Sequence, residues 1–217
     1  MYILLVSATT NEINTTRDWL ADNGGSVNGH EIEILISGVG SAMTSYAISK
    51  QLSWRSPEMV IQAGIGGSFS NSFPPGSVAF INEEVFADLG AMQNGEFTDI
   101  FDLGLADAEE HPFSNRMLIN PNTEPWVKYG LPFVRGATVN CITSTPQQVE
   151  QIRQKYEAVI ESMEGAALHY ACLKENIPFI QLRAVSNFVG ERDKNNWKMP
   201  EAIAVLNEKL RRILGWM

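Results

Sequence analysis

Short, uninterrupted apolar runs alternate along this chain with longer amphipathic segments, and this alternation constrains the fold more than any other feature. Runs such as Tyr2–Ser7 and Phe179–Val185 lack the polar alternation of a half-exposed strand, so they are typical of central strands covered on both faces. Strands that alternate with helices predict an α/β layer fold. No internal repeat or linker interrupts the pattern, and we expect a single domain over residues 1–217.

The boundaries of the expected elements follow from the same patterns. The predicted strands are Tyr2–Ser7, Glu31–Val39, Met59–Ala63, Ser77–Asn82, Phe133–Ile142, Ala158–Met163 and Phe179–Val185. The predicted helices are Glu12–Asn23, Ser41–Arg55, Pro146–Tyr156, Gly165–Asn176 and Pro200–Gly215. The proline-containing stretch Asp107–Pro132 has little periodicity, which predicts a long surface excursion.

The charge of the chain is acidic and unevenly placed. Sixteen Lys and Arg residues stand against 25 Asp and Glu residues, a net charge of −9. This balance excludes nucleic acids and anionic membranes as expected partners, because both need basic surface. Residues 56–115 hold ten carboxylates and no Lys or Arg. We call residues 56–115 the cation-free segment; the rest of the chain is close to neutral.

Cysteine usage and the N-terminal residues predict a cytoplasmic protein. Cys141 and Cys172 form no CxxC pair and no disulfide framework, which is typical of a reducing compartment. The chain starts without the basic residues and long apolar run of a signal peptide. No apolar run approaches the roughly 20 residues of a membrane span.

Two glycine-rich segments follow or end predicted strands. Residues 34–43 would need Gly at position 43 to match a dinucleotide-binding loop, and Met43 stands there. A second glycine loop, residues 62–68, is expected after the third strand. Two such loops at the carboxyl ends of strands are consistent with a small-molecule crevice, and equally with ordinary tight turns.

Three charged residues follow or interrupt predicted apolar strands. Glu164 follows an apolar strand, and Arg183 lies inside one, so both need partners; a structural ion pair explains them as well as a catalytic site does. Glu12 follows the first strand, where Thr9 and Glu12 have the spacing of a capping box. The three histidines have no metal-ligand spacing, so we expect no metal site.

The motifs taken together resemble one enzyme superfamily. Their order and spacing along nearly the whole chain are similar to those of the purine nucleoside phosphorylase/nucleosidase superfamily, and most similar to its futalosine hydrolase family, nucleosidases of the alternative menaquinone route. The residues that carry the resemblance are ATTNE ending at Glu12, GVG ending at Gly40, AGIGGS ending at Ser68, SMEG ending at Gly165, RAVSN ending at Asn187, EVFADLG ending at Gly90 and SNFVGERDKNNW ending at Trp197.

The resemblance implies a three-layer domain with a mixed central sheet, a homo-oligomer, and no metal or organic cofactor. Symmetry makes a dimer the first expectation. The resemblance also implies roles by matching position. Glu12 would activate water, Arg183 would hold that water and Glu12, and Asn187 would face N7 and O6 of the base. Substrate would be bound through Met163 and Glu164 at the ribose, and through Gly66, Gly67, Ser186 and the backbone near Cys141 and Ile142 at the base.

Chemistry refines these expectations. A 6-oxopurine presents two acceptors, O6 and N7, and the amide of Asn187 supplies two donors, so Asn187 favours hypoxanthine over adenine. The alternative is an ordinary turn Asn. A phosphorylase would need Arg donors for phosphate near the third-strand glycines, and these lie in the cation-free segment. Water is therefore the expected nucleophile.

The sequence does not identify the residue that holds the water or the residue that binds the far end of the substrate. Adenosine-type nucleosidases of the superfamily have a water-binding Ser where this chain has Ile65. We hypothesise that Arg192 binds the carboxylate at the far end of futalosine, with Phe86, Phe97 or Phe101 lining the arm; a solvated ion pair of Arg192 would explain it equally. The competing functions are methylthioadenosine/S-adenosylhomocysteine nucleosidase and a purine nucleoside-binding protein without turnover.

Overall fold

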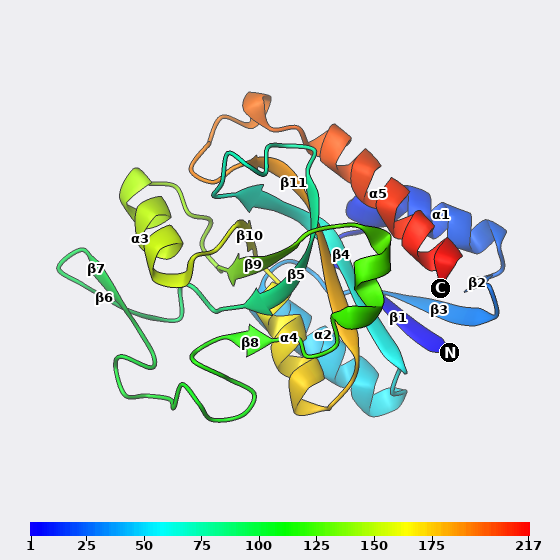
Figure 1. The fold of residues 1–217 in the computed structure, drawn as a ribbon, viewed down its shortest axis with the longest axis horizontal. Coiled ribbons are helices and arrows are strands. Elements are labelled where there is room, and N and C mark those ends of the chain that lie inside the picture. Colours follow the sequence, from blue (N-terminus) through cyan, green and yellow to red (C-terminus); the bar gives the residue numbers. More distant parts are fainter.

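The computed structural model describes residues 1–217 as a mixed sheet between two groups of helices (Figure 1). The strands are β1 (Tyr2–Ser7), β2 (Ser26–Val27), β3 (His30–Ile36), β4 (Met59–Ser68), β5 (Val78–Glu84), β6 (Gly90–Gln93), β7 (Glu96–Asp99), β8 (Leu118–Ile119), β9 (Phe133–Thr138), β10 (Ile160–Ser162) and β11 (Phe179–Phe188). The helices are α1 (Asn14–Asp22), α2 (Ser41–Trp54), α3 (Pro146–Tyr156), α4 (Gly165–Lys174) and α5 (Met199–Trp216), with 3-10 turns η1 (Thr10–Ile13), η2 (Glu124–Tyr129) and η3 (Lys194–Asn196).

This architecture confirms the predicted mixed α/β class. Strands β1, β3, β4 and β11 are parallel, whereas β5 runs antiparallel to β11. The order across the main sheet is β10, β9, β5, β11, β4, β1, β3, β2, and β8 pairs with β5. Each of the seven predicted strands and five predicted helices has a counterpart, while β2, β6, β7 and β8 were not predicted.

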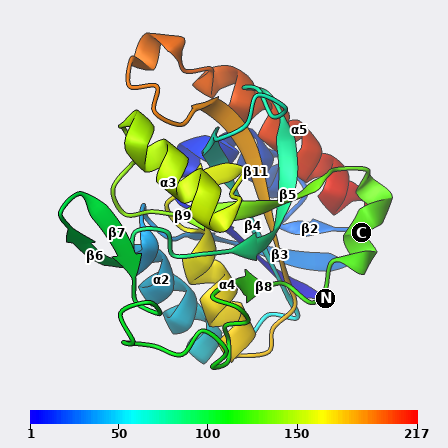
Figure 2. The same cartoon turned by 60° about the vertical axis from the view of Figure 1, so that its left-hand side comes forward.

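The three layers follow from the alternation of side chains along the buried strands. On β1, Ile3 and Leu5 face a core that α5 completes, and Leu4 and Val6 face a second core. Helices α2 and α4 cover that second core, side by side on one face, and α1 and α5 cover the other face (Figures 1 and 2). Because both faces are covered, the apolar runs are continuous, as the sequence indicates.

The predicted glycine loop at residues 62–68 is wrong, because these residues continue β4 to Ser68. At this end of β4, β10 pairs antiparallel with it through Ile160 and Glu161. The pairing closes β4, β11, β5, β9 and β10 into a ring. Gly66 permits the closure, since a Cβ there would lie 2.6 Å from the carbonyl oxygen of Glu161. The glycines thus serve close backbone approach within a strand.

The predicted excursion Asp107–Pro132 is only partly a surface feature. It contributes β8 and η2, and Leu118 and Trp126 are buried. Trp126 packs edge-on against Phe80 of β5, with ring centroids 5.8 Å apart. Before this stretch, the β6–β7 hairpin extends from the body (Figure 2). In the whole chain, no helix combines the length and apolar character needed to cross a membrane.

Candidate active site

A cavity of about 420 Å³ opens where β1, β4, β10 and β11 end. Ligand sites of open α/β sheets lie at the carboxyl ends of strands. The predicted site residues that line this cavity are Glu12, Gly66, Gly67, Ile142, Met163, Glu164, Ser186 and Asn187. Arg183 is buried beneath them, whereas Cys141 and Arg192 are exposed and lie outside the lining residues.

Glu12 combines a capping role with a place in the cavity. Its Oε2 accepts hydrogen bonds from the Thr9 amide at 2.9 Å and the Thr9 hydroxyl at 3.1 Å, and the capping box is complete. Its Oε1 accepts the Ile65 amide at 3.0 Å. One oxygen therefore orders the start of η1, and the other meets β4 at the cavity wall. The two interpretations of Glu12 are compatible.

Glu164 and Arg183 form a buried ion pair, with Arg183 Nη1 3.3 Å from Glu164 Oε2. The other Glu164 oxygen accepts the Gly40 amide at 3.1 Å. Gly40 has a φ of +94°, a conformation that favours glycine, so the first glycine segment turns its backbone N–H toward the carboxylate. Arg183 pairs with Glu164 and not with Glu12, and Nη2 donates to Gln62 at 3.2 Å.

Asn187 lines the same cavity from the end of β11. Its Oδ1 accepts the Ser186 hydroxyl at 2.8 Å, and its Nδ2 donates to the Phe188 carbonyl at 2.8 Å. The Phe188 carbonyl can only accept, so this bond fixes which end of the amide is the donor. One N–H of Nδ2 remains for a ligand, because a primary amide carries two.

Glu161 was not predicted as a site residue, yet it lines the same cavity and is 6% exposed. Its Oε1 accepts the Thr143 amide at 3.3 Å, and its Oε2 has no partner. Burial raises the pKa of Glu161 to about 7. The same cavity is also lined by the hydrophobic side chains of Trp197, Met199 and Ile203. A carboxylate inside a predicted strand was the available signal for Glu161.

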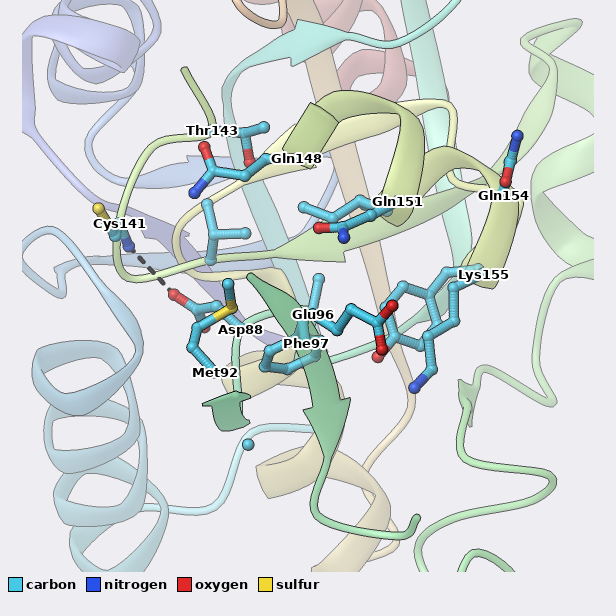
Figure 3. Close-up of a pocket in the computed structure, with 15 residues that line it drawn as sticks. Asp88, Met92, Glu96, Phe97, Cys141, Thr143, Gln148, Gln151, Gln154 and Lys155 are labelled. Carbon is cyan, nitrogen blue, oxygen red and sulfur yellow. Dashed lines mark hydrogen bonds between the residues drawn. The ribbon is translucent and has the colours of Figure 1, made fainter. Parts of the chain in front are cut away.

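A larger cavity, about 680 Å³, lies between α3 and the β6–β7 hairpin (Figure 3). Its cation, Lys155, is paired with Asp99 at 2.9 Å and Asp102 at 2.8 Å. Asp88 accepts the amide of Cys141 at 3.1 Å, the dashed contact in Figure 3. These charged groups are occupied by protein partners. Phe97 lines this cavity and Phe101 packs on Phe113, so neither lines the smaller cavity.

The smaller cavity has the chemistry of a neutral polyol site. Glu12, Glu161 and Glu164 line it, and no Lys or Arg does. Carboxylates accept hydrogen bonds from hydroxyls, activate water and stabilise developing positive charge. They repel anions. The cavity therefore fits a ligand that contains a sugar and is cleaved by water. Asn187 can donate a hydrogen bond to an acceptor group of this ligand.

Comparison with known proteins agrees with this geometry. Residues 24–215 match the family model described as phosphorylase superfamily. Futalosine hydrolase of Streptomyces coelicolor is 32% identical over 187 residues, covering 83% of this chain and 77% of the relative. Futalosine hydrolase of Thermus thermophilus is 29% identical over 183 residues, covering 83% and 80%. The structure of a 5'-methylthioadenosine/S-adenosylhomocysteine nucleosidase from Neisseria meningitidis, in complex with methylthio-immucillin-A, matches with a TM-score of 0.83 at 18% identity, covering 100% of this chain and 99% of that one.

Proposed function

The chain belongs to the futalosine hydrolase family of the phosphorylase superfamily, and we propose that it hydrolyses the N-glycosidic bond of futalosine in the cytoplasm as one domain of residues 1–217. The products are hypoxanthine and the remaining sugar. The observation that carries the proposal is a cavity where Glu12 and Glu164 line one space with Asn187 and no cationic side chain lines it.

Each residue has a chemical task in the proposed reaction. Cleavage of an N-glycosidic bond passes through an oxocarbenium-like sugar, which carboxylates stabilise. Glu12 takes a proton from the attacking water. Glu164, held by Arg183 and the Gly40 amide, binds the ribose hydroxyls beside Met163. Asn187 donates a hydrogen bond to N7 or O6, so the base leaves more readily with the electron pair of the C–N bond. The departing base then takes up one proton from solvent, which balances the proton that Glu12 removes from water.

The base pocket and the far end of the substrate complete the assignment. Gly66, Gly67, Ser186 and Ile142 line the base, with the backbone of Cys141 next to Ile142. The far-end carboxylate of futalosine would be met by Arg192, which is exposed on the loop before η3.

We further propose that the chain forms a homo-oligomer, with a dimer as first expectation. Helix α2 starts next to the cavity-lining Val39 and leaves Met43 and Tyr46 54% and 68% exposed. A second copy packed on this face would cover these apolar groups near the mouth of the cavity. Light scattering in solution measures the mass.

The test incubates the protein with futalosine, inosine and methylthioadenosine, with and without phosphate, and measures the free base. We expect hypoxanthine from futalosine at a rate independent of phosphate. Glu12→Gln should lower kcat by about 10²–10⁴, whereas Glu175→Gln, an exposed site at the end of α4, should keep it. Thermal melting establishes that both variants fold.

Three outcomes would refute the proposal, each in favour of a competing function. Release of adenine alone would identify a methylthioadenosine-type nucleosidase. Strict dependence on phosphate would identify a phosphorylase. Binding without release of base would identify a nucleoside-binding protein.

A further inference from the structure

Glu161 presents a buried oxygen that no protein group satisfies. Oε1 accepts the Thr143 amide, and Oε2 has no partner although the side chain is more than nine-tenths buried. The carboxyl group forms no ion pair; Arg192 acts on it only through space. Leaving a buried polar group unsatisfied is energetically costly. Such a group inside a ligand cavity needs a donor, and a bound ligand can supply one.

The strand pairing places Glu161 opposite Asn187. Glu161 of β10 pairs with Gly67 of β4 on one side, and Asn187 of β11 pairs with Gly67 on the other. Residues paired across strands project from the same face, and neighbouring strands are about 4.8 Å apart. The two polar side chains therefore stand roughly 10 Å apart at the backbone and line one cavity.

Gly67 leaves the space between them open. A Cβ on residue 67 would lie 3.4 Å from the Asn187 amide nitrogen and 3.0 Å from the side chain of Val189. A larger residue would fill the gap that separates the donor on β11 from the acceptor on β10. The arrangement is a slot beside Gly67 with a hydrogen-bond donor on one side and an acceptor on the other.

We propose that Glu161 determines base specificity by accepting the N1–H of a 6-oxopurine at Oε2, while the remaining N–H of Asn187 donates to O6 or N7. This inference rests on the proposed function and adds a residue to it. Along its edge, a 6-oxopurine presents two acceptors, N7 and O6, and then a donor, N1–H. This order is complementary to the amide donor of Asn187 followed by the carboxylate acceptor of Glu161. Adenine presents an N6 donor and an unprotonated N1. Its N1 lone pair would face the carboxylate oxygen, so the slot selects against it.

A purely positioning role is the competing explanation. Through Thr143, Glu161 also holds the segment that contains the cavity-lining Ile142. If Glu161 acted only through that segment, its substitution would lower kcat/KM equally for nucleosides of every base. The two explanations are separated by the ratio of activities on two bases and not by activity alone.

The test is Glu161→Gln at pH 8, with Glu175→Gln as control. Gln keeps an oxygen for the Thr143 amide and places an N–H donor where Oε2 stood. The ratio of kcat/KM for inosine to that for adenosine should fall at least about 100-fold, since a site built to pair a polar group discriminates strongly. 1-Methylinosine, which lacks the N1–H, should be a poor substrate that the substitution does not worsen.

Calorimetry with free hypoxanthine and free adenine gives a readout that needs no turnover. Hypoxanthine should bind the native chain more tightly than adenine does, and Glu161→Gln should remove this preference. Equal losses for both bases, an unchanged ratio, or native cleavage of 1-methylinosine as fast as inosine would each overturn the proposal. Absence of any nucleoside cleavage by the native chain would instead refute the proposed function, while calorimetry still tests Glu161.

Discussion

Substitution of Gly64 by Ala tests whether the glycines of β4 exist to admit the side chains of Glu12 and Arg183, the proposed catalytic groups. Gly64 has no positive φ, so its backbone conformation is open to Ala and any effect comes from the added methyl group. That methyl group would overlap the Arg183 guanidinium and lie 3.0 Å from Glu12 Oε1.

The size of the effect follows from how firmly Arg183 is held. The residue is 1% exposed, and its guanidinium contacts Glu164 at 3.3 Å, the Ile65 carbonyl at 3.3 Å and Gln62 at 3.2 Å. It cannot retreat without losing one of these contacts. Overpacking costs about 1–3 kcal/mol, and a broken buried ion pair costs about 3–5 kcal/mol. We expect the free energy of unfolding to fall by about 2–4 kcal/mol.

Activity should fall as well, since displacement of the proposed catalytic groups by about 1 Å can cost roughly 100-fold in rate. Urea unfolding and kcat/KM for futalosine measure the two effects on the same preparation. The control is Gly215→Ala near the end of α5, where a Cβ would meet nothing within 4 Å. Gly64→Ala that stays within about threefold of native kcat/KM and about 0.5 kcal/mol of native stability would refute the reasoning.

Two further predictions concern a buried carboxyl group and the far end of the substrate. Burial raises the pKa of Glu84 from 4.5 to about 7, so this residue stabilises the fold fully below pH 4.5 and loses that contribution as pH rises through 7. Between pH 5 and pH 8 the native chain should therefore lose up to about 3 kcal/mol of unfolding free energy relative to Glu84→Gln, measured by urea unfolding at each pH; parallel pH curves for the two proteins would contradict this. Arg192→Ala should raise KM for futalosine several-fold and leave inosine cleavage unchanged, because inosine lacks the far-end carboxylate; equal effects on both substrates would remove Arg192 from the site.

The sequence was informative where burial is continuous. Strands such as β1 and helices such as α3 have their predicted ends, because an apolar run or a capping box with a following Pro encodes the boundary locally. The glycines of β4 were misassigned as a loop for a non-local reason. They are required by β10 and by the side chains of Glu12 and Arg183, which come from distant parts of the chain.

The site shows the same division. Glu12, Glu164 and Asn187 could be placed together only through resemblance to a family, since nothing in their spacing says that three strand ends meet. Glu161 was not predicted as a site residue because a Glu inside a short strand is typical of a side chain that faces solvent. Its burial follows from the pairing of β10 with β4 at Gly67, which closes the ring. The paired residues are almost a hundred positions apart in the sequence, so no local pattern indicates the pairing.

The cation-free segment does not favour water as the nucleophile through its own carboxylates. Those carboxylates are largely engaged elsewhere: Asp99 and Asp102 pair with Arg116 and Lys155.

The three carboxyl groups of the cavity, Glu12, Glu161 and Glu164, all lie outside the segment. The segment contributes β4, which forms one wall of the cavity and carries no cationic side chain. A phosphate charge about 5 Å from the Glu12 carboxylate would be repelled by roughly 3 kcal/mol at an effective dielectric constant of about 20. The buried Arg183 pairs with Glu164 and does not line the cavity. Water meets no such barrier and finds acceptors for its protons, so the charge of the cavity itself selects hydrolysis.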